Sequence, residues 1–167
     1  QPGPSSEVEP FPIRVYVEDP CLETASKSSF ESDRMDSLTD LNIFVYHDGL
    51  LLEDCSVYYD DMSETMLSFP VGTDGFSIYM LGNVGCVSAP PYESQMREIR
   101  HIVGDYAEFK EHGVPVAGTF KDYRKGDLAE FPLKRLVGQF DIRMEVSAQD
   151  ADYVIKDIRV MNCAKDV

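Results

Sequence analysis

The 167-residue sequence has no tryptophan and only fifteen basic residues against thirty acidic ones, for a formal net charge of -15. So negative a field repels phosphate backbones, which argues against nucleic acid as a partner and against binding to an anionic membrane surface. No apolar run approaches the roughly 20 residues that span a bilayer. The opening QPGPSSEVEPF lacks the basic and apolar regions of a signal peptide. These absences do not assign the chain to a compartment.

The residue spacings of metal and catalytic sites are also missing. The cysteines lack the C-x-x-C pairs of a zinc framework and are Cys21, Cys55, Cys86 and Cys163. They could form two disulfides in an oxidising compartment or remain small buried thiols, and we expect Cys86 to be buried. The histidines are not spaced as ligands and are His47, His101 and His112. The acidic stretches YYDDMSE and SAQDAD do not match a calcium loop. We therefore predict no catalytic residue, metal site or cofactor, and no enzymatic activity.

What the chain does contain is alternation of apolar and polar residues, typical of strands with one buried face. The clearest case is FPLKRLVGQFDIRMEV at residues 131–146. The basic pair Lys134 and Arg135 stands where we expect a long strand to start, and we predict that it pairs with carboxylates on neighbouring loops. Exposed pairs of this kind contribute about 0–1 kcal/mol each. The role predicted for the basic pair is therefore structural.

The predicted organisation is a flexible leader over residues 1–10 followed by one domain over residues 11–167. Within the domain we expect a first strand at 11–17, an exposed polar loop at 19–40 and a sandwich body at 41–167. In the body, LNIFVY, LLLEDCSVYY, SETMLSFP and FSIYMLGN read as strands, with HDG and VGTDG as turns.

One segment of the body has helical spacing. Met96, Ile99, Ile102 and Val103 predict an amphipathic helix of about three turns, which Gly104 ends. About nine short strands and one helix predict an all-β fold, an antiparallel β-sandwich with its helix across an open end or edge.

The order of TDLNIFVYHDG, SFPVGTDGFSIYMLGNVG, ESQMREIRHIV, GVPVAGTF and FPLKRLVGQFDIRMEV resembles the N-terminal domain of the fimbrillin-type pilus proteins of Bacteroidetes. The resemblance covers about residues 38–167. It implies a transthyretin-like, Greek-key β-sandwich, followed in the family by a second domain that this chain would lack. It also implies export as a lipoprotein to the outer membrane surface, with a lipid anchor outside this chain.

In stalk subunits of that family, cleavage after a basic residue removes the first strand, and a strand of the neighbouring subunit fills the groove. By this resemblance the candidate cleavage site is Arg34, although it can equally be an ordinary solvated loop residue. The side chains of the candidate exchanged strand are Phe11, Ile13, Val15 and Val17.

The sequence-based function is a structural subunit of a cell-surface fimbria, whether stalk, tip or anchor, with other fimbrial subunits as partners and adhesion to host or bacterial surface ligands. The alternative is a surface adhesin or carbohydrate-binding sandwich that does not polymerise. Its support is the supply of aromatic rings on which sugars stack, notably Tyr58, Tyr59, Tyr79, Tyr92 and Tyr123.

Overall fold

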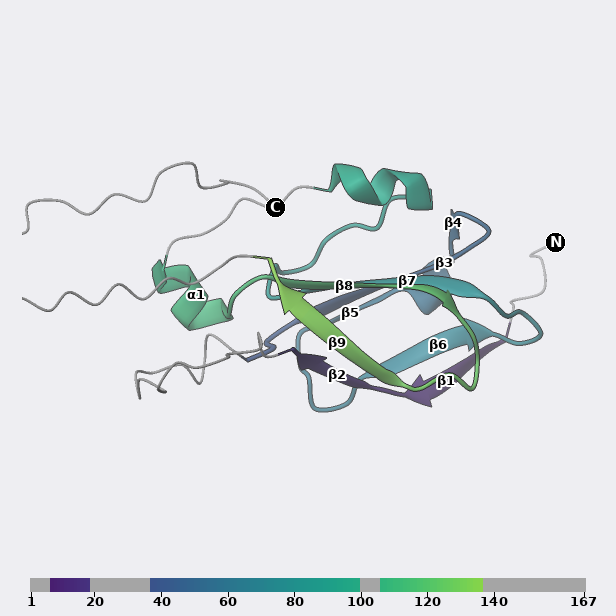
Figure 1. The fold of residues 1–167 in the computed structure, drawn as a ribbon, viewed down its shortest axis with the longest axis horizontal. Helices are drawn as coiled ribbons and strands as arrows, with labels where there is room; N and C mark the ends of the chain where they lie inside the picture. The colour runs from purple at the N-terminus through teal and green to yellow at the C-terminus, as the bar shows by residue number, and fades with distance from the viewer. Residues whose placement is uncertain (1–6, 19–36, 100–105, 137–167) are drawn as a thin grey trace, which may run out of the picture.

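The structure is a computed structural model that describes residues 7–18, 37–99 and 106–136 (Figure 1). Its strands are β1 (Val8–Pro12), β2 (Arg14–Val17), β3 (Leu41–His47), β4 (Leu50–Leu51), β5 (Val57–Tyr59), β6 (Met66–Pro70), β7 (Phe76–Gly82), β8 (Val116–Tyr123) and β9 (Glu130–Arg135). Its helices are the 3₁₀ turns η1 (Glu53–Cys55) and η2 (Glu93–Glu98) and the α-helix α1 (Tyr106–His112). No helix in these ranges has the length and hydropathy needed to cross a membrane.

The strands form two sheets that face each other. The larger sheet has the order β2-β9-β8-β7-β3-β4, with β5 also paired to β3, and the smaller sheet joins β1 to β6. β9 pairs with β2 over its first four residues and with β8 only at its last two, Lys134 and Arg135. It therefore runs from the layer that holds β1, β2 and β6 to the layer that holds β7 and β8 (Figure 1). The all-β sandwich predicted from the sequence is confirmed.

The core lies between these two layers. β7 alternates strictly between buried and half-buried residues, and Phe76, Ile78 and Met80 face inward. Phe69 of β6 stacks on Phe76 with ring centroids 4.3 Å apart. Gly118 of β8 leaves no room for a side chain, because an added Cβ would lie 2.8 Å from Leu133 and 2.9 Å from the Phe120 ring. Close packing of this kind makes even one-carbon changes costly.

β3 departs from alternation, since its first six residues are all buried. Its outward side chains are covered by the connection over residues 84–99, which crosses the outer face of the larger sheet and includes η2. Asn42 donates to Gly85 O (2.7 Å) and accepts from Val87 N (2.9 Å), and the Tyr46 hydroxyl donates to Pro90 O (2.7 Å). We call residues 84–99 the strap.

The first strand differs from the prediction in two ways. Val8–Pro10 belong to β1, so the leader predicted over residues 1–10 extends three residues too far. The predicted single strand is also two strands, because the chain changes sheets at Ile13. Pro12 has no N–H to donate to a ladder, which suits a position at the end of β1.

The predicted three-turn helix is wrong. Residues 93–98 form a 3₁₀ helix, and Ile99 is extended (φ −63°, ψ 130°). The Tyr92 N–H donates to Gln95 Oε1 at its start. Met96 and Ile99 recur at helical spacing because both line the space between the strap and the sheet. Ile102, Val103 and Gly104 lie outside the described residues.

The strand predicted for LLLEDCSVYY is interrupted. β4 and β5 are separated by η1, which buries Cys55. Ser56 replaces the missing ladder bonds, because its hydroxyl donates to Leu52 O (2.9 Å) and accepts from Val45 N (3.1 Å). A polar side chain that serves both neighbours lets the edge bend without leaving buried backbone unpaired. The HDG turn is confirmed, with positive φ at Asp48 (50°) and Gly49 (77°).

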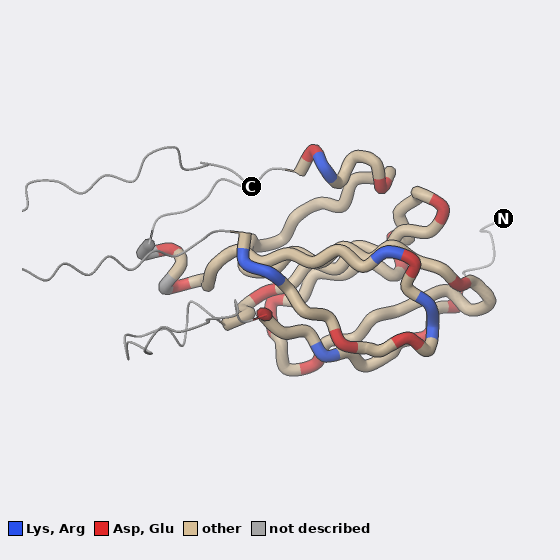
Figure 2. The backbone as a smooth tube through the Cα atoms, viewed as in Figure 1, with Lys and Arg blue, Asp and Glu red and all other residues tan. Residues whose placement is uncertain are grey.

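The basic pair is also placed differently from the prediction. Lys134 and Arg135 end β9 rather than start a strand. Basic residues of the described chain gather on β8, β9 and the turn between them, whereas acidic residues are spread over many turns (Figure 2). Lys125 in that turn lies 3.6 Å from Glu9 Oε2 of β1, so the turn contributes an ion pair across the sandwich.

Candidate functional site

The residues that the sequence singled out for exchange lie in residues 7–18, which we call the first segment. β1 runs antiparallel to β6, from Val8 opposite Pro70 to Pro12 opposite Met66. β2 runs parallel to β9, from Arg14 opposite Glu130 to Val17 opposite Leu133. Within the described residues, each strand has one neighbour and forms an edge of its sheet. Removal of this edge segment would keep the order β9-β8-β7-β3-β4 of the larger sheet unbroken and would leave β6 without its partner in the smaller sheet.

The four candidate side chains all pack against the core. Phe11, Ile13, Val15 and Val17 are half-buried and contact the central cluster of buried residues. The Phe11 ring lies 5.9 Å from the Phe69 ring. The side chains that they cover in β6 and β9 are fully buried, and these are Leu67, Phe69, Phe131 and Leu133. Removal of the first segment would therefore open an apolar groove along β6 and β9.

Few polar side-chain contacts hold the first segment against β6 and β9. Arg14 lies 3.6 Å from Glu130, but the two side chains are 70% and 41% exposed. Lys125 Nζ donates to Pro70 O (2.6 Å) as well as approaching Glu9. Exposed ion pairs contribute about 0–1 kcal/mol, so apolar packing and backbone pairing hold the segment.

The candidate cleavage site Arg34 lies outside the described residues. The chain is next described at Ser37, and residues 37–40 lead into β3. Thr39 N donates to Asn83 Oδ1 (2.8 Å), and Asn83 Nδ2 donates to Ser37 O (2.9 Å). Asp40 Oδ1 accepts from Val84 N (3.3 Å) and Gly85 N (3.2 Å). Burial raises the pKa of Asp40 although these hydrogen bonds oppose the rise.

A second candidate site is a groove of about 830 Å³ on the outer face of the larger sheet. The strap forms one wall, with Tyr92, Met96 and Ile99, and β8 supplies part of the floor, with Ala117 and Thr119. Tyr92 is 54% exposed and is available for stacking. Mostly apolar grooves with a few polar groups are the usual form of small-molecule sites.

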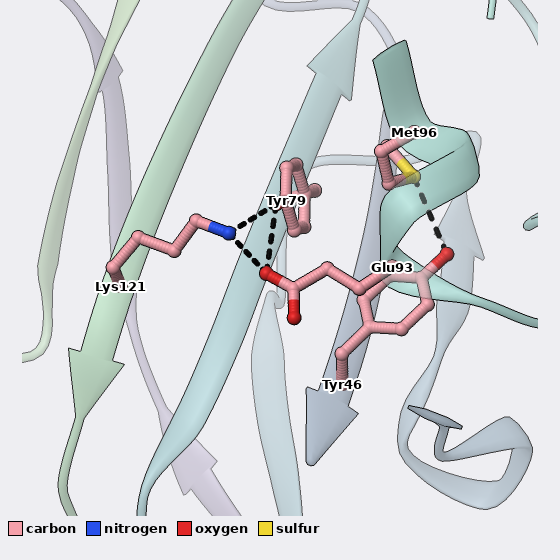
Figure 3. A network of polar contacts seen from close by, with 5 residues as sticks. All are labelled: Tyr46, Tyr79, Glu93, Met96 and Lys121. Carbon is pink, nitrogen blue, oxygen red and sulfur yellow. Dashed lines mark hydrogen bonds and ion pairs between the residues drawn. The ribbon is translucent and has the colours of Figure 1, made fainter. Parts of the chain in front are cut away.

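Polar side chains that line this groove form a network that joins the strap to the sheet (Figure 3). Lys121 of β8 donates to Tyr79 Oη (2.5 Å) and to Glu93 Oε1, and the Tyr79 hydroxyl donates to Glu93 Oε1 (2.9 Å). Tyr46 Oη lies 3.3 Å from Met96 Sδ. We call Tyr79, Glu93 and Lys121 the clasp.

The electrostatics of the clasp are those of a closed network. Burial raises the pKa of Glu93, but hydrogen bonds from Lys121, Tyr79 and Ser77 outweigh it and hold the pKa below its usual range. Hydrogen bonds to Glu93 and Tyr79 raise the pKa of Lys121. Burial raises the pKa of Tyr46 to about 12, with the charges of Tyr79 and Glu93 adding to it. Every charged group of the clasp has a partner, so the role of the clasp is to attach the strap to the sheet.

The remaining candidate residues are not brought together. Cys55 is buried and Cys86 is exposed, both as free thiols, so the expectation that Cys86 is buried is wrong. Cys86 follows β7 in a turn where Asn83 and Gly85 have positive φ, as the tight strand exit requires. His47 Nδ1 lies 2.8 Å from Gly75 O. Cys21, Cys163 and His101 lie outside the described residues. Within 7–18, 37–99 and 106–136, no three metal-ligating side chains gather into a site.

Two features of the site were missed by sequence reasoning. The clasp joins Tyr79, Glu93 and Lys121, which are 14 to 42 positions apart and carry no common motif. Asn83 lies in no motif that would single it out, and its contacts are to Thr39, which is 44 positions away. Only the combination of a buried position with a left-handed backbone could have marked Asn83, and burial is not visible in the sequence.

Comparison of the chain with protein-family models, with curated proteins and with solved structures finds no match.

Proposed function

We propose that this chain is a structural subunit of a cell-surface fimbria of the fimbrillin type and assembles with other subunits by strand addition. One observation supports this most directly: the first segment forms an edge of both sheets while its apolar side chains pack on the core. A transthyretin-like topology, export and a surface location belong to the same proposal and rest on the resemblance of the sequence.

The free energy that the first segment contributes by burying its apolar side chains is compatible with strand exchange. A fully buried apolar side chain contributes about 1.5–3 kcal/mol, so four half-buried ones contribute roughly 3–6 kcal/mol together. Domain stabilities are about 5–15 kcal/mol. Loss of the first segment would thus leave the body marginal, with exposed apolar surface and unpaired backbone, until a second strand docks.

Limited proteolysis with an Arg-specific protease tests the proposal. We expect release of the first segment with the body intact, followed by higher oligomers in size-exclusion chromatography. Arg34→Gln is the matched control, and it should keep the segment attached. Resistance of the wild-type chain, or a released body that stays monomeric, would count against exchange and favour an anchor or a stand-alone surface domain.

A peptide experiment tests the seat itself. A synthetic peptide with the sequence of residues 8–17 should bind the cleaved body and block oligomer growth. A control peptide in which Phe11, Ile13, Val15 and Val17 are replaced by Ser should do neither, because alternate apolar side chains give specificity in strand addition. Equal activity of the two peptides would show that the apolar register is irrelevant.

The alternative is carbohydrate binding, and the position of Tyr92 beside the outer groove favours it. Tyr59 and Tyr123 instead serve the fold: Tyr59 Oη donates to Met66 O (2.9 Å), and Tyr123 stacks on Phe69. Tyr79 belongs to the clasp, and Tyr58 does not line the groove. Glycan-array binding that Tyr92→Ala abolishes would support a lectin role. An array without any signal would rule out the carbohydrate-binding alternative and leave the fimbrial proposal as the remaining one.

A further inference from the structure

The chain enters the body at residues 37–40 without any strand pairing. Two bonds from Thr39, its N–H (2.8 Å) and its hydroxyl (3.0 Å), converge on Asn83 Oδ1. In return Asn83 Nδ2 donates to Ser37 O (2.9 Å). A single side chain therefore holds the backbone on both sides of Leu38.

Asn83 is built into the fold as a connector. Asn83 is only 6% exposed. Its Nδ2 also donates to Val114 O (2.9 Å), which lies just before β8. Its backbone N–H donates to Asp40 O (3.2 Å). With φ at 63°, the residue adopts a left-handed conformation that Asn tolerates better than most side chains. The side-chain amide of Asn83 therefore makes its hydrogen bonds to Thr39 and to the backbone carbonyls of Ser37 and Val114.

The polar side-chain contacts of the first segment differ from those of residues 37–40. The side-chain ion pairs of the first segment join partly exposed groups at 3.6 Å, at Arg14–Glu130 and Lys125–Glu9. Residues 37–40 instead are held by partly buried hydrogen bonds to Asn83, and the one proton of the Thr39 hydroxyl is shared between Asn83 Oδ1 (3.0 Å) and His112 O at the end of α1 (2.6 Å). An unpaired buried amide is costly, so these bonds resist local opening.

We propose that the carboxamide of Asn83 anchors the start of the permanent body and so fixes where the exchangeable part of the chain ends. The inference rests on the proposed function, because it assigns a boundary to the exchange. When the first segment leaves, residues 37–40 stay on Asn83, and β3 keeps its place in the larger sheet. Asn83 is thus a positioning residue for strand exchange.

Hydrogen exchange followed by NMR on the intact, uncleaved chain tests the anchor. Asn83→Gly removes the carboxamide and keeps the left-handed backbone accessible. We expect the amides of Thr39, Val84 and Gly85 to exchange about tenfold faster, which corresponds to about 1.4 kcal/mol of opening free energy. Amides in the middle of β7 should change little.

Two further variants keep the test sharp. Thr39→Val removes only the hydroxyl bonds to Asn83 and His112, and should give a smaller acceleration at the same amides. Ser56→Ala removes a comparable part-buried hydroxyl at the far edge of the sheet, and should leave the Thr39 amide unchanged. Uniform acceleration across the body in Asn83→Gly, or none at Thr39, would overturn the anchor.

A second readout uses the cleaved chain. After Arg-specific cleavage, we expect digestion by an unspecific protease to stop before Thr39 in the wild type and to proceed into β3 in Asn83→Gly. Identical end points by mass spectrometry would overturn the boundary role. Failure of wild-type cleavage or assembly would overturn the proposed function instead, while the exchange rates of the intact chain would still decide the anchor.

Discussion

Phe11 offers the sharpest test of how the first segment is held. It is the half-buried residue of β1 that packs on the core, and its ring lies 5.9 Å from that of Phe69. Full truncation of a buried Phe costs about 3–5 kcal/mol, so half burial predicts roughly 1.5–2.5 kcal/mol for Phe11→Ala. Val8, which is 37% exposed on the same strand, supplies the control: Val8→Ala should change the free energy of unfolding by at most about 0.5 kcal/mol.

Urea unfolding measures both variants. The chain has no tryptophan, so the change is followed by tyrosine fluorescence and by circular dichroism, and coincident transitions confirm two-state behaviour. A double-mutant cycle with Phe69→Leu should give a coupling of about 0.5–1.5 kcal/mol between the rings. Equal losses in Phe11→Ala and Val8→Ala, or a coupling of zero, would refute the idea that apolar packing holds the first segment.

Three other changes test the rest of the structure. Lys121→Met should lower stability by at most about 1 kcal/mol, because the lysine is 54% exposed. Since the pKa of Glu93 is lowered in the fold, its contribution is present above about pH 4.5 and is lost as the pH falls through the folded pKa. The gap between wild type and variant in urea titrations should therefore close on acidification, and a constant gap contradicts the clasp. Iodoacetamide should label Cys86 in the native protein and Cys55 only after unfolding, because burial raises the pKa of Cys55 to about 11 and hides it; peptide mass spectrometry that finds both labelled at equal rates would contradict this. Gly118→Ala should cost about 1–3 kcal/mol in thermal or urea unfolding, since its Cβ would come within 2.9 Å of two core side chains, and an unchanged stability would show that the core can yield there.

The sequence predicted those features that depend on neighbours along the chain. FSIYMLGN was predicted to be a strand and residues 76–82 of it form β7, and Asp48 and Gly49 form the predicted hairpin turn. Both follow from local backbone geometry and the period of a strand. The four side chains named for the candidate exchanged strand follow the same local period, and all four pack against the core.

Prediction failed where distant parts of the chain decide the structure. Met96 and Ile99 have helical spacing, yet they serve as contacts of an irregular strap whose path is fixed by β3 and the clasp. The full burial of β3 likewise requires the strap to cover its outer face. Apolar residues that recur at regular spacing indicate that one side of a segment contacts an apolar surface. An extended segment that covers a sheet can produce the same spacing as a helix.

The path of β9 places a demand on any strand that replaces the first segment. β1 forms an edge of the smaller sheet and β2 forms an edge of the larger sheet, so the first segment changes its partner from β6 to β9 at Ile13. A donor that matched β6 alone would cover Leu67 and Phe69 but leave Leu133 open, and a donor that matched β9 alone would do the reverse. Each half contributes too little to offset the ordering of a free strand. A donor must therefore carry apolar residues in register across both halves and bend between them, and this requirement can select one strand among the many that could pair with either edge.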